Sequence, residues 1–238
     1  MEAETNMEVN KVEKKVVALS FVGENFSSKF LLCWTNTLSI LWQSGEYEFL
    51  IATGDNPSLY HSRLRSLGLN NEISRPFNNT KFDYWVTIDS SILFSPQQVI
   101  ELIKSLDEHP IVSGLYKTND GVSYNAVKQL DNDYFATNGH YQYLLQDDID
   151  NWTKEVNTKY MPVEFVGLSF FGMRSDVFEK LEYPFFDGER VVIKKDETTT
   201  YDIVPSEEYN LCKKLLSKDY KIMLNTELRV GNSINFVV

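Results

Sequence analysis

Two kinds of position in this sequence carry acidic side chains that could do chemistry. Asp55 and Asp89 each follow an apolar run, and Glu207 and Glu208 open a helical pattern. A carboxylate at a strand end can bind a sugar hydroxyl or a metal ion, and one beside an acceptor hydroxyl can remove its proton. The same residues could have structural roles instead. Aspartate is common in turns and at helix caps, and acidic side chains at a helix N-terminus interact favourably with the helix dipole.

The elements that must position these acids alternate through the first half of the chain. Apolar runs predict strands at Val16–Val22, Tyr47–Thr53, Asp83–Asp89 and Ile111–Tyr116. Helices are predicted over 26–42, capped by Asn25 or Ser27 and stopped by Gly45, over 58–67, and from Pro96 to about Glu108. This alternation indicates a mainly parallel α/β sheet, whose ligands lie beyond the carboxyl ends of the strands. Asp55 and Asp89 both fall at that edge.

The second half has a different pattern. Residues 121–172 predict short aromatic strands and turns, a β-rich insertion, and residues 175–181 predict a short helix. The polar stretch 187–204 suits a mobile loop, and a helix from Pro205 and a strand over 220–226 follow. We expect a disordered tail at 1–14 and a single domain at 15–238.

Composition and charge argue against several classes of protein. The chain has 238 residues and a net charge of −11, which disfavours a nucleic-acid binder or a binder of anionic membranes. No segment approaches the ~18 apolar residues of a membrane span. The polar, acidic start is not a signal or transit peptide, so a cytoplasmic protein is expected. Cys33 and Cys212 fall in helical patterns and are predicted to be buried structural thiols.

Three stretches in order resemble a GT-A glycosyltransferase: YWVTIDSSILFSP at 84–96, VEFVGLSFFGMRSDVFEKLEYPFF at 163–186, and SEEYNLCKKLLSKDYKIMLNTELRVGNSI at 206–234. The group in question contains mannan-polymerase-like enzymes and glycosyltransferases of large algal viruses, so a viral protein in host cytoplasm is one implication. The resemblance spans residues 16–235. It implies a nucleotide-binding half at 15–117 and an acceptor-side half at 118–238. The implied reaction transfers a sugar, with inversion, from a UDP- or GDP-sugar to a glycan or glycoprotein acceptor.

The resemblance also implies roles for individual residues. Asp89 and Ser91 match the first and last acids of the family's Asp-x-Asp, and Asn232 matches a late histidine. In the family, that last acid and the histidine hold Mn²⁺ or Mg²⁺. Because Ser91 and Asn232 are neutral, we expect such an ion to bind weakly or not to be required. Glu208 matches the family's catalytic base, and Glu207 stands beside it.

Other residues are expected to contact the substrate. Asp55 falls on the nucleoside side, and Arg63 matches an arginine that would face the donor diphosphate, although Leu64 departs from the family's asparagine. Gly167 and Phe171 belong to the Gly-rich aromatic stretch. Aromatic side chains of the second half, and Tyr116, could stack on sugar rings, with core packing as the alternative.

Two other functions stay open. The neutral residues at both metal positions favour a nucleotide-sugar-binding protein without turnover, whereas the acids at Asp89, Glu207 and Glu208 favour an enzyme. A sugar-nucleotidyltransferase would need a Gly-rich basic loop after the first strand, and FVGENFSSKF at 21–30 has one glycine.

Overall fold

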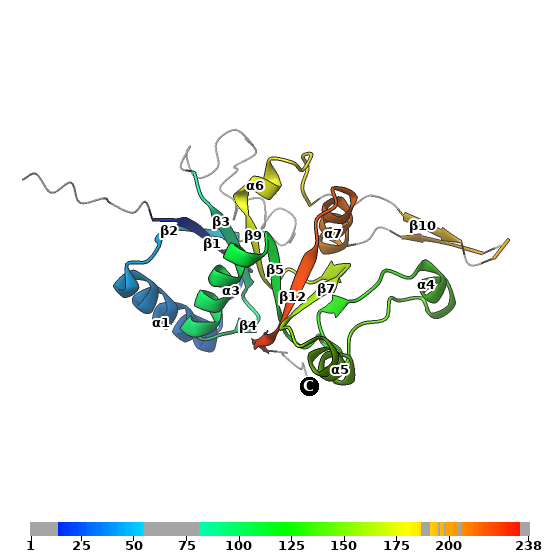
Figure 1. The fold of residues 1–238 in the computed structure, drawn as a ribbon, viewed down its shortest axis with the longest axis horizontal. Helices are drawn as coiled ribbons and strands as arrows, with labels where there is room; N and C mark the ends of the chain where they lie inside the picture. The colour runs from blue at the N-terminus through cyan, green and yellow to red at the C-terminus, as the bar shows by residue number, and fades with distance from the viewer. Residues whose placement is uncertain are drawn as a thin grey trace, which may run out of the picture.

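The computed structural model describes residues 14–54, 81–186, 191–194, 196–197, 199–203 and 206–233. Its centre is a seven-stranded sheet in the order β2-β1-β3-β9-β5-β12-β7 (Figure 1). Five strands run in one direction: β1 (Val16–Val22), β2 (Glu48–Gly54), β3 (Tyr84–Asp89), β5 (Ile111–Leu115) and β12 (Ile222–Arg229). Two run against them: β9 (Phe170–Arg174) and β7 (Tyr160–Val163). The predicted class, a mainly parallel α/β sheet flanked by helices, is confirmed.

Side chains of the sheet alternate between two hydrophobic cores. Along β3, Tyr84, Val86 and Ile88 belong to one core, while Trp85 belongs to the other. The first core also holds α1 (Ser28–Ser44) and α3 (Pro96–Glu108), and the second holds α7 (Glu207–Ser217). Because successive side chains of a strand point to opposite faces, these helices cover opposite faces of the sheet.

Two of the three predicted helices of the first half fall among the described residues and begin where predicted, while the third, over 58–67, lies outside them. Ser27 Oγ accepts from Phe30 N at 3.1 Å, and Gly45 ends α1 in the left-handed conformation at φ 61°. Ser95 forms a capping box with Gln98 in front of Pro96, which opens α3. Two large apolar side chains of α1, Leu31 and Trp42, are 49% and 59% exposed.

The second half departs from the predicted β-rich insertion. It contains α4 (Asn132–Asn138) and α5 (Gln146–Val156) beside the short strands β6 (Ala126–Val127) and β8 (Phe165–Val166). Asp131 caps α4 and Gly139 ends it, a local signal that the aromatic pattern obscured. A loop was predicted over 187–204, yet β10 (Val191–Lys194) and β11 (Thr200–Ile203) pair as a hairpin. This hairpin and α4 project from the sheet on the same side in Figure 1.

The remaining elements are short. The helix α6 (Ser175–Phe178) follows β9, while β4 (Ile92–Leu93) and β13 (Gly231–Asn232) form a separate two-stranded ladder. Both cysteines are free thiols, Cys33 half-buried and Cys212 fully buried. Burial raises the pKa of Cys212 to about 12. Across the ranges described, no helix has both the length and the apolar character to cross a membrane.

Candidate active site

Asp89 ends β3 and is held by the residue that precedes β9. The backbone N–H of Asp89 donates to the Ser169 carbonyl at 2.9 Å, and Ser169 Oγ donates to Asp89 Oδ2 at 2.7 Å. The antiparallel pairing of β3 with β9 brings the two residues together. The Ser169 hydroxyl and the backbone hydrogen bond therefore fix the orientation of the Asp89 carboxylate.

A buried phenol connects this edge to α7. Ser169 N donates to the Tyr116 hydroxyl at 3.2 Å. Burial raises the pKa of Tyr116 strongly, and the negative charges of Asp89 and Glu208 raise it further. The charges of both carboxylates therefore raise the pKa of this one hydroxyl.

Gly167 makes room for that phenol. A Cβ on Gly167 would lie 2.1 Å from the Tyr116 hydroxyl oxygen, so no other residue type fits here without a shift. Its backbone N–H donates to the Asn125 carbonyl at 2.8 Å, and the Asn125 side chain accepts from Tyr116 N at 3.0 Å. The predicted site residue Gly167 thus supports the site through its backbone.

The turns that follow β1 and β3 touch each other. Ser90 N donates to the Val22 carbonyl at 2.8 Å, and Gly23 N donates to the Gly54 carbonyl at 3.0 Å. Gly23 has φ 150°, and a Cβ on it would lie 2.2 Å from Ser90 Oγ. Glycine is needed here for both reasons. The carboxyl ends of β1, β2 and β3 consequently meet at one point of the sheet edge.

The C-terminal segment joins the turn after Asp89. Asn232 pairs with Ile92 in the ladder of β13 and β4, and both the N–H and the hydroxyl of Ser233 donate to the Ser91 carbonyl, at 2.7 and 2.9 Å. Asn232 Nδ2 donates to the Lys117 carbonyl at 2.9 Å. Asn232, far from Asp89 and Ser91 in the sequence, thus lies at the same edge as they do.

A cleft of 790 Å³ opens over this edge. One wall is the segment Asn25–Lys29, which includes the first turn of α1, and the other is formed by Ser90, Ser91, Asn232 and Ser233. Among the described residues that line it, Lys29 alone is charged. The cleft is therefore rich in hydroxyl and amide groups and holds one cation.

The donor groups at this edge do not fit a resident divalent cation. Asp89 supplies a carboxylate, one oxygen of which already accepts from Ser169, while Ser91 and Asn232 supply neutral oxygens only. In the part of the chain that the structure describes, no three His, Cys, Asp or Glu side chains form a metal-binding group. Mn²⁺ and Mg²⁺ prefer several anionic oxygens, so a single carboxylate holds them weakly.

The acids Glu207 and Glu208 form the first turn of α7. Ser206 caps this helix, and its Oγ accepts from Tyr209 N at 3.4 Å. Further along α7, the Cys212 thiol lies 3.7 Å from the carbonyl of Val166, the residue before Gly167. This contact fixes α7 beside the segment that carries Gly167 and Ser169.

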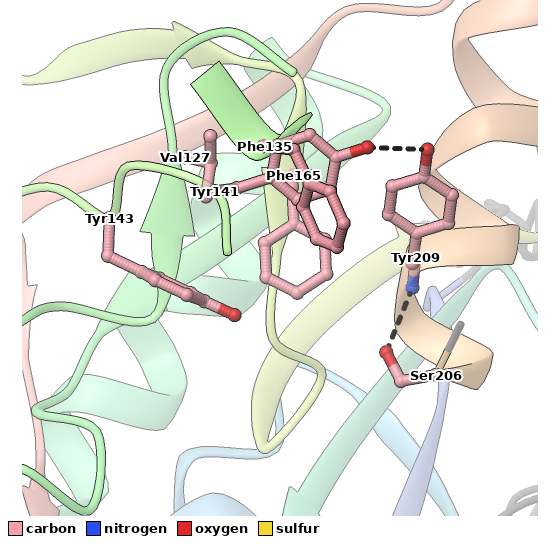
Figure 2. A pocket seen from close by; sticks show the side chains of 7 residues that line it. All are labelled: Val127, Phe135, Tyr141, Tyr143, Phe165, Ser206 and Tyr209. Atoms are coloured by element: carbon pink, nitrogen blue, oxygen red, sulfur yellow. Dashed lines mark hydrogen bonds between the residues drawn. The ribbon is translucent and has the colours of Figure 1, made fainter. Parts of the chain in front are cut away.

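A second, smaller pocket of 160 Å³ adjoins the start of α7 (Figure 2). Its walls are mainly aromatic: Phe135, Tyr141, Tyr143, Phe165 and Tyr209, completed by Val127 and Ser206. The Tyr141 and Tyr209 hydroxyls are hydrogen-bonded at 3.1 Å, which closes one side. The pocket is hence an aromatic space next to an acidic helix start.

Comparison with known proteins gives weak similarities. No protein-family model matches the sequence, and no curated protein matches it. A197 from STIV has a TM-score of 0.46 and 13% identity over 92% of this chain and 82% of that chain. GalNAc-T7, solved with UDP, GalNAc and Mn²⁺, has a TM-score of 0.48 and 12% identity over 94% of this chain and 44% of that chain. The chain thus spans less than half the length of GalNAc-T7.

The predicted site residues have different outcomes. Asp55 and Arg63 lie outside the described residues, so their predicted roles stay predictions. Phe171 is fully buried with its ring 6.1 Å from that of Trp85, so the predicted substrate contact is wrong and its role is core packing.

Sequence reasoning missed Ser169 and Lys29. Ser169 comes just before an apolar strand, and nothing in the pattern distinguishes it from an ordinary turn serine. Lys29 follows the helix cap Ser27, and its position in the first turn was the available signal that a cation stands at the sheet edge.

Proposed function

We propose that this protein is a GT-A-type glycosyltransferase that moves a sugar from a nucleotide-diphosphate sugar to a glycan acceptor. One observation carries the proposal: Asp89, held by Ser169 Oγ at 2.7 Å, stands at the carboxyl edge of the sheet, while Glu208 stands in the first turn of α7. A cleft suited to a polar ligand adjoins the first acid, and an aromatic pocket adjoins the second. Two separate spaces, each next to a carboxylate, suit a reaction with two substrates.

The donor occupies the larger cleft. Asp89 accepts hydrogen bonds from hydroxyl groups of the donor, the ribose being the first candidate, because its orientation is fixed by Ser169. Lys29 stands where it can offset the charge of the diphosphate, and Arg63 keeps its predicted role in the same task. Ser91 and Asn232 supply neutral hydrogen-bonding groups to the cleft.

The reaction is a single displacement. Glu208 accepts the proton of an acceptor hydroxyl, and that oxygen forms a bond to the anomeric carbon. The bond between this carbon and the diphosphate oxygen breaks, and the nucleotide diphosphate leaves with the electron pair. The configuration at the anomeric carbon inverts because the two oxygens lie on opposite sides of it. Glu207 is the alternative base.

Finer features of the proposal come from the resemblance in sequence. They are the kinship with mannan-polymerase-like and algal-virus enzymes, the use of UDP or GDP, the cytoplasmic location, and the division into nucleotide and acceptor halves at residue 117. Each of these features is a separate proposal. They are tested by the nucleotide sugar that the protein prefers and by the source of the protein.

A donor screen tests the proposed function. UDP- and GDP-sugars are added to the full chain, and we measure thermal stabilisation and release of the free nucleotide, with and without Mn²⁺. A donor at a hundredfold above its Kd should stabilise the fold by about 2.7 kcal/mol. Stabilisation without nucleotide release in any acceptor mixture would favour the binding protein that lacks turnover. No stabilisation by any nucleotide sugar would overturn the proposal.

A further inference from the structure

We infer that the aromatic pocket in front of α7 binds one sugar ring of the acceptor and presents its hydroxyl to Glu208. That the bound sugar belongs to the acceptor rests on the proposed function. The binding of a sugar ring can be tested without it. Four considerations carry it: the chemistry of the walls, the arrangement of the rings, the size of the space and its place beside the acids.

The walls combine aromatic faces with hydroxyl groups. Tyr141, Tyr143 and Tyr209 each present a ring and a phenol oxygen, and Ser206 adds a hydroxyl. A pyranose has an apolar face of C–H groups and a rim of hydroxyls, so it can pack on a ring and hydrogen-bond at its edge. None of the seven described residues that line the pocket carries a charge, which disfavours a phosphate or a carboxylate ligand.

The orientation of the rings disfavours a nucleobase. Tyr141 and Tyr209 are close to parallel, at 17°, but their centroids are 5.7 Å apart. A base between two rings needs two contacts of about 3.5 Å each, and therefore more room than this. The rings of Tyr143 and Phe165 are nearly perpendicular, at 84°, so a flat ligand can stack on only one of them. The pocket consequently does not suit a nucleobase held between two rings.

The size of the pocket fits one ring. Its 160 Å³ is about a fifth of the 790 Å³ of the larger cleft. An oligosaccharide would extend beyond it, with only its terminal unit enclosed.

The pocket lies directly beside the proposed base. Ser206 and Tyr209 line it, and Glu207 and Glu208 are the two residues between them on the first turn of α7. Burial raises the pKa of Tyr143, and the charge of Glu208 raises it as well, so this carboxylate acts on the far wall of the pocket. A ring held here has a hydroxyl within the field of Glu208.

Tyr143 is the residue to change. Its ring is 36% exposed, whereas Phe135, Phe165 and Tyr209 are at most 9% exposed and belong to the core. Tyr143→Ala removes the stacking face of the most exposed aromatic residue that lines the pocket, and Tyr143→Phe keeps the face. Trp42→Ala serves as the matched control, because Trp42 is an exposed aromatic residue on α1.

Saturation-transfer NMR tests the inference without any turnover. The probes are methyl glycosides of glucose, galactose, mannose and N-acetylglucosamine, added to the full-length wild-type chain and to the three variants. We expect transfer to at least one glycoside in wild type, Tyr143→Phe and Trp42→Ala, and a drop of roughly tenfold in affinity in Tyr143→Ala. No transfer to any glycoside, or equal affinity in Tyr143→Ala, would overturn the inference. Nucleotide release by the wild-type chain tests the proposed function separately, so the two failures are distinguishable.

Discussion

Ser169 donates its hydroxyl hydrogen to Asp89 Oδ2 at 2.7 Å, while its backbone N–H donates to the Tyr116 hydroxyl at 3.2 Å. A single serine thus connects the carboxylate at the end of β3 to a buried phenol whose pKa is raised mainly by burial and further by the charges of Asp89 and Glu208. The position of Asp89 depends on this serine, and the donor site can be tested through both residues.

Asp89→Asn should weaken donor binding by roughly 10- to 100-fold, because hydrogen bonds to a charged group contribute about 1.5–3 kcal/mol. Ser169→Ala should weaken it by about tenfold, since the carboxylate loses the donor that orients it. Isothermal titration with the donor identified in the screen measures both. Ser39→Ala, an exposed serine on α1, is the control. Unchanged affinity in Asp89→Asn would remove this residue from the donor site.

Glu208→Gln should lower transfer by roughly 10²-fold or more while donor affinity stays the same. The substitution keeps the size of the side chain and removes its ability to take a proton. The measurement is kcat for transfer together with donor Kd.

Glu207→Gln is the matched control, one residue away on the same helix turn. It should retain most of the transfer activity. If Glu207→Gln loses activity and Glu208→Gln does not, the roles of the two acids are reversed.

Local signals in the sequence predicted the first half of the fold well. The strand Val16–Val22 is an uninterrupted apolar run that only a sheet buried on both faces accommodates, and it was predicted with its observed bounds. Caps at Ser27 and Gly45 predicted the helix between them. These are signals within a few residues of each other.

The site depended on contacts that no local pattern contains. Asn232 and Ser91 were linked by the resemblance, and the structure joins their segments through a ladder and through Ser233. The insertion of β9 between β3 and β5 brings Ser169 to Asp89, and nothing local predicts this order of strands. Phe171 was misplaced because an aromatic residue in a strand has the same pattern whether it faces a core or a ligand.

Gly167→Ala should destabilise the fold by about 1–3 kcal/mol, the usual cost of overpacking a tight site. The added methyl would lie 2.1 Å from the Tyr116 hydroxyl oxygen. Urea unfolding measures the change. Tyr116→Phe removes that oxygen, so the double variant should lose less stability than the sum of the two single variants. If the losses of the two single variants simply add, the close approach of residue 167 to the Tyr116 hydroxyl does not determine which residue fits at position 167.

Asp107→Asn should lower the free energy of unfolding by about 0.5–1 kcal/mol at pH 7, because Asp107 pairs with Lys15 and accepts from Tyr84 at 2.6 Å in a half-exposed cluster. Burial alone would raise the pKa of Asp107, but the hydrogen bonds from Lys15 and Tyr84 lower it overall. Its contribution is therefore present above the unfolded pKa of about 3.9 and lost as the pH falls through the lower folded value.

The hydrogen bond to Asp107 is the main reason that the pKa of Lys15 is raised. The contribution of Lys15 is complete below its unfolded pKa of about 10.4 and is lost as the pH rises toward the folded value. The difference between wild type and Asp107→Asn should hence be constant near neutral pH and shrink below about pH 4 and above about pH 10. Urea unfolding from pH 3 to 10.5 measures it, with Glu155→Gln as an exposed control. A difference that keeps its full neutral-pH size at pH 3 would contradict the assignment.

Transfer should depend only weakly on divalent metal. The edge offers one carboxylate, Asp89, so a free Mn²⁺ ion should bind in the roughly millimolar range or more weakly. We expect most of the activity to survive in EDTA, and Lys29→Ala to reduce turnover more than EDTA does, since its cation faces the proposed diphosphate site. Complete loss of activity in EDTA, restored by micromolar Mn²⁺, would contradict this prediction.

The double variant Ser91→Asp with Asn232→His should gain metal binding. It adds a second carboxylate and an imidazole at an edge where β13 and β4 already hold the two segments together. The new histidine can donate one ring N–H to the Lys117 carbonyl, as Asn232 Nδ2 does at 2.9 Å, and leave the other nitrogen for the ion. Calorimetric titration should show Mn²⁺ affinity at least about tenfold above wild type. Equal affinity in the two proteins would mean that Asp89, Ser91 and Asn232 do not face a common point.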